Sequence, residues 1–105
     1  MDDQLIIQLF NERSEEAITA ISDKYGELCK AISYRILKNK EDAEECVNDT
    51  YLHTWNSIPP HEPQILSTYL GKITRRLSFD KFRYNNADKR GGGEISLVLD
   101  ELSEC

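Results

Sequence analysis

Apolar residues recur every three or four positions through most of this chain, and few helix-breaking residues interrupt them. The prolines are confined to Pro59, Pro60 and Pro63, and the only glycine cluster is 91–93. A spacing of three and four residues places side chains on one face of an α-helix, whereas a half-buried strand needs strict alternation, which no stretch shows. The sequence therefore predicts an all-α fold, a compact bundle of about four helices.

The limits of these helices follow from capping and breaking residues. The four predicted helices cover residues 2–10, 15–37, 41–57 and 63 to about 87. Ser14 is a plausible N-cap for the second, which tolerates Gly26 at about 1 kcal/mol relative to alanine. Asn39 is expected to end that helix in the left-handed conformation, and Pro63 to lie in the first turn of the fourth. The buried side of the fourth helix is predicted to consist of Leu66, Tyr69, Leu70, Ile73 and Leu77.

Length and cysteine content exclude several classes of protein. A chain of 105 residues fits one domain. It has no apolar run of the roughly 20 residues that a membrane span needs, and no secretory signal at its start, so we expect a cytoplasmic protein. Cys29, Cys46 and Cys105 are odd in number and lack C-x-x-C spacing, which argues against disulfides and zinc. Cys29 and Cys46 are predicted to be buried.

Charge is distributed unevenly along the chain. The formal net charge is −6. Residues 1–62 have six basic and 13 acidic side chains, residues 63–90 have seven basic and two acidic, and residues 91–105 have four acidic and no basic side chains. The predicted molecule is therefore an acidic body with a basic fourth helix.

The basic side chains of the fourth helix share one face. On a helical wheel this face spans about 100° and is centred roughly 120° from the apolar one. Its members are Lys72, Arg75, Arg76, Phe79 and Arg83. Such a row suits nucleic acid, because cations neutralise phosphates and an aromatic ring can stack on an unpaired base. A solvated face that balances the acidic body explains the same pattern, and periodicity does not separate the two.

The third helix has the opposite charge. Asp42, Glu44, Glu45 and Asp49 crowd its first half, which indicates either compensation of the helix dipole or a docking surface for a basic partner. Glu45, Asp49 and His53 lack the second Glu-x-x-His helix of bundle metal sites, so we predict no metal. Catalytic serine motifs and phosphate-binding glycine loops are also missing, so we expect neither an enzyme nor a cofactor.

Two motifs resemble a known family. Residues 42–55, D-A-E-E-C-V-N-D-T-Y-L-H-T-W, resemble the D-A-E-D-L-V-Q-E-T-F-L-x-x-W signature of bacterial RNA polymerase sigma factors of the extracytoplasmic-function (ECF) group. Residues 69–83, Y-L-G-K-I-T-R-R-L-S-F-D-K-F-R, are similar to the W-L-x-x-I-A-R-N-x-x-x-D-x-x-R motif that follows there. The resemblance spans about residues 2–90. The chain departs from it at Tyr69, often Trp in the family, and at Arg76, where the family has Asn.

The resemblance implies a fold and a function. Residues 1–90 would be region 2 of a sigma factor, an all-α domain that binds core polymerase, recognises the promoter −10 element and melts it by capturing the non-template single strand. Residues 91–105 would begin the interdomain linker or form a short helix. The helix-turn-helix domain that reads the −35 element is absent from the sequence, so we expect a fragment. The family also has anti-sigma factors as partners.

The resemblance also assigns residues to three surfaces. Docking on the β′ clamp helices would involve Asp42, Glu45, Asn48, Asp49, Leu52 and His53. A pocket for an extruded base, between Asn56 and Thr68, would use Asn56, Ser57, His61, Ser67 and Thr68. The promoter strand would contact Lys72, Arg75, Arg76, Phe79 and Arg83. The alternative is a helical protein-interaction domain, a regulator that keeps the polymerase-docking helix without DNA recognition.

Overall fold

The computed structural model describes residues 1–86, which form four helices and no strand. The helices are α1 (Asp3–Asn11), α2 (Glu16–Leu37), α3 (Lys40–Ser57) and α4 (Leu66–Asn85). The predicted all-α bundle is confirmed for these residues, and the expectations for residues 87–105 lie outside them. No helix in this part of the chain is both long enough and apolar enough to cross a membrane.

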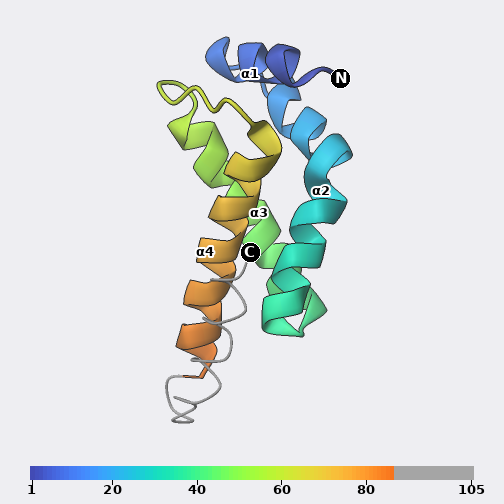
Figure 1. Ribbon diagram of the computed structural model, residues 1–105, viewed down its shortest axis with the longest axis vertical. Coiled ribbons are helices and arrows are strands. Elements are labelled where there is room, and N and C mark those ends of the chain that lie inside the picture. Colours follow the sequence, from blue (N-terminus) through green and yellow to red (C-terminus); the bar gives the residue numbers. More distant parts are fainter. Residues whose placement is uncertain (87–105) are drawn as a thin grey trace.

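The three long helices pack against one another, and α1 packs on α2. α3 and α4 form an antiparallel hairpin, joined by residues 58–65, here called the proline loop (Figure 1). α1 lies across the end of the bundle at which α2 begins and α3 ends. The proline loop and α1 therefore share one end of the molecule.

Three predicted helix limits are wrong. Glu15, not Ser14, is the N-cap residue of α2, although the Ser14 hydroxyl accepts a hydrogen bond from the Glu16 amide at 3.3 Å. Lys38, not Asn39, adopts the left-handed conformation after α2, with φ 56°. Asn39 is extended and is the N-cap of α3, where its side-chain oxygen accepts a hydrogen bond from the Asp42 amide at 2.9 Å. Asparagine is favoured at an N-cap because its side chain accepts a hydrogen bond from a free backbone amide. Here this preference is stronger than its preference for the left-handed conformation at a helix end. Pro63 precedes α4, which begins at Leu66, the first residue after the proline loop that is buried in the core.

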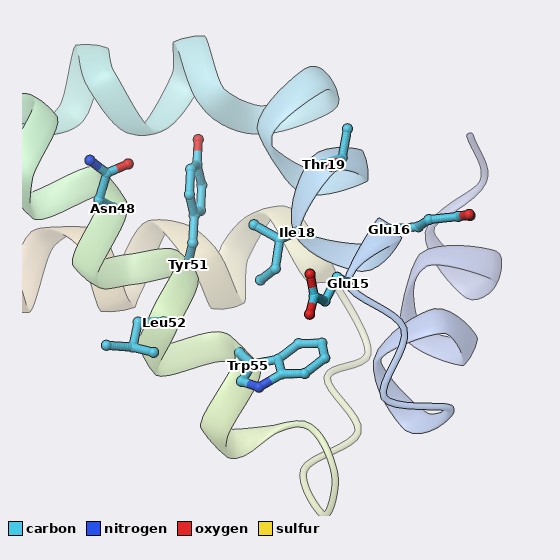
Figure 2. A pocket seen from close by; sticks show the side chains of 8 residues that line it. All are labelled: Glu15, Glu16, Ile18, Thr19, Asn48, Tyr51, Leu52 and Trp55. Carbon is cyan, nitrogen blue, oxygen red and sulfur yellow. The ribbon is translucent and has the colours of Figure 1, made fainter.

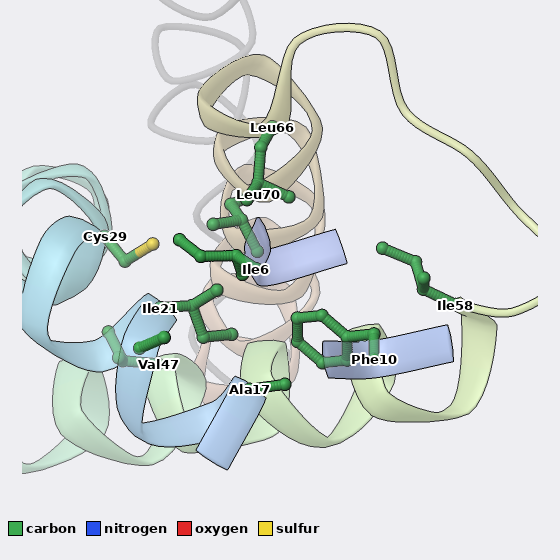
Figure 3. Close-up of a cluster of buried hydrophobic side chains, with 10 residues drawn as sticks. Ile6, Phe10, Ala17, Ile21, Cys29, Val47, Ile58, Leu66 and Leu70 are labelled. Carbon is green, nitrogen blue, oxygen red and sulfur yellow. The ribbon is translucent and has the colours of Figure 1, made fainter. Parts of the chain in front are cut away.

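One hydrophobic cluster holds the four helices together (Figure 3). Its members are Ile6, Phe10, Ala17, Ala20, Ile21, Cys29, Val47, Ile58, Leu66 and Leu70. Ile6 and Phe10 are fully buried, so α1 closes the end of the bundle. Cys29 and Cys46 are buried and free, as predicted, and burial raises the pKa of both thiols.

Polar contacts also fix α1 to α2. Asp3 accepts hydrogen bonds from Lys24 Nζ at 2.8 Å and from the Tyr25 hydroxyl at 2.7 Å. Burial opposes the charge of Asp3, but these hydrogen bonds outweigh it and lower the pKa of the carboxyl. The start of α1 is therefore bound to the third turn of α2 through a carboxylate whose ionised form these contacts favour.

The buried side of α4 is wider than its apolar residues predict. Leu66, Leu70 and Ile73 are buried, but Tyr69 and Leu77 are only half-buried. The small residues Gly71, Thr74 and Ser78 are buried instead. Ser78 donates to Ser33 of α2 at 2.6 Å, and the hydroxyls of Thr74 and Thr50 of α3 are 3.1 Å apart. These paired hydroxyls let α4 approach both neighbours closely, because each buried polar group has a partner.

Candidate functional site

Polar pairs join α3 to α4 along the edge of the hairpin. The pairs are Asp42 with Asn85 at 3.1 Å, Glu45 with Lys81 at 2.6 Å, and His53 with Arg76 at 3.2 Å. The hydrogen bond to Glu45 raises the pKa of Lys81, so this lysine stays charged. The acidic side of α3 and the basic side of α4 are therefore adjacent surfaces, in direct contact along one edge.

The structure places the six predicted docking residues on one face of α3, here called the outward face. At 100° per residue they span a sector of about 140°, opposite the buried Ala43 and Val47. Glu45, Asn48, Asp49 and Leu52 are exposed, whereas Asp42 and His53 are half-buried beside α4. Leu52 is 58% exposed and lies among polar side chains on this face.

A groove runs beside the outward face, between α3 and the start of α2 (Figure 2). It is lined by Glu15, Glu16, Ile18, Thr19, Asn48, Tyr51, Leu52 and Trp55. Its apolar members lie on both helices. Glu16, the first residue of α2, and Glu15, just before it, contribute carboxylates. Sequence reasoning missed the contribution of α2, because nothing local indicates that Ile18 faces α3 across a groove.

The basic face of α4 differs from its prediction at Phe79. Lys72, Arg76 and Arg83 are exposed and Arg75 is half-buried, but Phe79 is only 8% exposed. The expectation of an exposed aromatic ring is wrong, because the buried side of α4 extends around the helix as far as this residue.

Arg83 covers the ring of Phe79. Its guanidinium carbon lies 4.5 Å from the ring centroid, a cation–π distance, and the same side chain forms an ion pair with Asp80. The exposed row on α4 therefore consists of Lys72, Arg76 and Arg83, with Arg83 already paired within the helix.

The predicted base-pocket residues lie at the two ends of the proline loop and, for His61, within it. Asn56, His61 and Thr68 are exposed, and Ser57 and Ser67 are half-buried. The Ser57 and Tyr69 hydroxyls are 2.7 Å apart, and the His61 amide donates to the Ser57 carbonyl at 2.9 Å. The His61 and Tyr69 rings are 6.4 Å apart. Tyr69, which sequence reasoning placed in the core, thus connects both sides of the loop.

Arg13 is a second residue that sequence reasoning missed. It lies in the corner between α1 and α2 with φ 59°, a conformation that costs a non-glycine residue about 1–2 kcal/mol. Its Nη1 donates to the carbonyls of Trp55 at 2.7 Å and Ile58 at 3.1 Å. The short polar break around Arg13 gives no signal of these contacts, because its partners lie more than 40 positions away.

Within residues 1–86, no three His, Cys, Asp or Glu side chains come together to hold a metal ion. The outward face of α3 is acidic and attracts cationic groups, whereas the exposed row on α4 is basic and attracts anionic groups.

Comparison with known proteins gives one match. The sequence model of the family described as Sigma-70 region 2 matches residues 21–87. The matched range includes most of α2, all of α3, the proline loop and α4, and it leaves out α1 and Arg13. No match was found among curated proteins or among solved structures.

Proposed function

Because the chain belongs to the sigma-70 region 2 family, we propose that it acts in transcription initiation, by binding core RNA polymerase through α3 and the promoter −10 element through α4 and the proline loop. The family consists of transcription initiation factor domains rather than enzymes. The observation that supports the proposal best is the polarity of the α3–α4 hairpin. One helix exposes carboxylates and the other exposes cations, so a protein and a DNA strand can be bound side by side.

The outward face of α3 suits a basic helical partner. Leu52 offers an exposed apolar side chain, and Glu45 and Asp49 offer carboxylates on the preceding turns of the same face. The adjacent groove extends this surface to α2 and adds Glu15 and Glu16. Apolar side chains next to polar and charged ones are typical of a protein interface. The proposed partner is the pair of β′ clamp helices, and an anti-sigma factor is a second partner for the same surface.

The exposed row on α4 suits a single DNA strand. Lys72 and Arg76 point away from the core, and each would neutralise a phosphate. Phe79 is not available for stacking, so the proposed contact with an unpaired base falls to the proline loop, where the His61 ring is exposed near Tyr69. Contacts made only with unpaired bases shift the duplex toward its open state, which is the proposed mechanism of melting.

The two motifs support a place in the ECF group and a region 2 domain over residues 1–90, with a linker in 91–105. Arg76 replaces the asparagine of that motif, so the base preference of the family is not part of this proposal. The proposed location is the cytoplasm, where the polymerase acts.

The polymerase contact is tested by binding of the 105-residue chain to core polymerase and to a β′ clamp-helix fragment. Asp49→Lys on the outward face should weaken both interactions by at least about tenfold, since it places a cation opposite a basic partner. Asp23→Lys, the same change on an exposed position of α2, is the matched control and should leave both unchanged. Equal affinities for the two variants would reject the docking surface.

A further inference from the structure

Arg13 connects the α1–α2 corner to a segment that lies more than 40 positions away in the sequence. Its guanidinium binds the carbonyls of Trp55 and Ile58 and lies 3.9 Å from the centroid of the Trp55 ring. Trp55 belongs to the last turn of α3, and Ile58 is the first residue of the proline loop. One side chain from the α1–α2 corner thus contacts both the end of α3 and the beginning of the loop.

The backbone of this corner does not require an arginine. Its turn is closed by main-chain hydrogen bonds, from the Arg13 amide to Phe10 at 3.0 Å and from the Ser14 amide to Leu9 at 2.9 Å. Glycine adopts a positive φ without strain, so it would suit the same backbone better. What arginine adds at this position is the set of contacts that its side chain makes with α3 and the proline loop.

The two carbonyls that Arg13 binds lie at a helix end. The last carbonyls of a helix have no partner within it and carry the negative end of the helix dipole. A planar guanidinium can donate to two of them while stacking on an indole, which an ammonium cannot do. Beyond Ile58, which is fully buried, Pro59 to Glu62 are exposed. The contacts of Arg13 therefore fix the direction in which the loop leaves α3.

We propose that Arg13 is a positioning residue: it holds the proline loop in the conformation that receives an unpaired base. This proposal rests on the proposed function, because the loop is the part assigned to the base. Arg13 does not touch the base in this account. It acts through the carbonyls of Trp55 and Ile58 and through the hydrogen-bonded segment from Ser57 to His61.

The test compares Arg13→Gly and Arg13→Lys in the 105-residue chain, with Arg35→Gln, an exposed charge removal on α2, as the control. Trp55 is the only tryptophan, so quenching of its fluorescence reports directly on the guanidinium stack. Amide exchange at His61 reports on the loop, and binding of a −10-like non-template oligonucleotide, in the presence of core polymerase, reports on its use.

We expect Arg13→Gly to expose Trp55 to quencher, to speed exchange at His61 about tenfold and to weaken oligonucleotide binding about tenfold, the factor that corresponds to about 1.4 kcal/mol. Arg13→Lys should restore part of each, because it keeps the charge but loses the planar fork. Arg35→Gln should change neither quenching nor exchange.

The outcomes separate the two proposals. If Arg13→Gly leaves quenching and His61 exchange as in the wild type, Arg13 does not order the loop and the inference is overturned. If the loop is released but oligonucleotide affinity is unchanged, Arg13 is only structural. If the wild-type chain with polymerase does not bind the oligonucleotide, the proposed function fails, while quenching and exchange still decide whether Arg13 orders the loop.

Discussion

Gly71 and Gly26, the glycines of α4 and α2, should respond differently to replacement by alanine. Gly71, in α4, has room for a methyl group: an added Cβ would lie 3.6 Å from Ile32 Cδ1 and 3.7 Å from Arg75 Nη1, ordinary contact distances. Alanine is favoured over glycine in a helix by about 0.5–1 kcal/mol. Gly71→Ala should therefore stabilise the chain by about 1 kcal/mol, which raises the thermal midpoint of a domain of this size by about 4–8 °C.

Gly26, in α2, lacks that room. An added Cβ would lie 3.1 Å from the Tyr51 hydroxyl oxygen, so the half-buried ring must shift. Overpacking of this kind costs about 1–3 kcal/mol, which cancels or exceeds the helical gain. In the Tyr51→Phe background the obstructing oxygen is gone, and Gly26→Ala should then stabilise relative to Tyr51→Phe alone.

Thermal unfolding followed by far-UV circular dichroism measures the wild type and the four variants, and the double-mutant cycle isolates the coupling of Gly26 with Tyr51. The reasoning would be refuted if Gly26→Ala raised the midpoint as much as Gly71→Ala. It would also be refuted if the effect of Gly26→Ala were the same with Tyr51 and with Phe at that position.

Two further substitutions test the helix ends. Asn39→Ala should lower the free energy of unfolding by about 1 kcal/mol, because the Asp42 amide loses its cap, whereas Asn39→Asp should retain most of the stability in urea unfolding. Equal losses would contradict the capping role. The pKa of Asp3 is lower in the folded state than in the unfolded state, where it is about 3.9. Its hydrogen bonds with Lys24 and Tyr25 therefore stabilise the fold at pH values above about 3.9, and this stabilisation is lost as the pH falls through the folded-state pKa. Asp3→Asn should remove that acid-dependent component, and stability–pH profiles that stay parallel for the two chains would contradict it.

The helices could be predicted from the sequence because a helix is a local structure. The period of three and four residues identified all four helices, and their observed limits differ from prediction by at most three residues. The failures occurred where a residue has two compatible roles. Asn39 suits a helix stop and an N-cap, and only the free amide of Asp42 decides between them.

Helix faces were harder to predict because burial depends on neighbouring helices. Hydrophobicity alone left Thr74 and Ser78 off the buried side, although both find hydroxyl partners on other helices. The predicted buried sector of α4 was too narrow, and Phe79 was therefore placed in the exposed row although it is buried. Arg13 shows the limit most clearly, since its three contacts join segments whose proximity is set only by the complete bundle.

The central claim is that α4 binds a DNA strand through its exposed cations, and the salt dependence of oligonucleotide binding tests it most directly. For a single strand, log K falls with log salt concentration by about 0.7 per neutralised phosphate. Replacing Lys72 and Arg76 together by glutamine should reduce the slope of the polymerase-bound chain by about 1.4, with a loss of affinity. The matched control, glutamine at Lys30 and Arg35 on α2, should leave the slope unchanged. Identical slopes for the two double variants would contradict the claim.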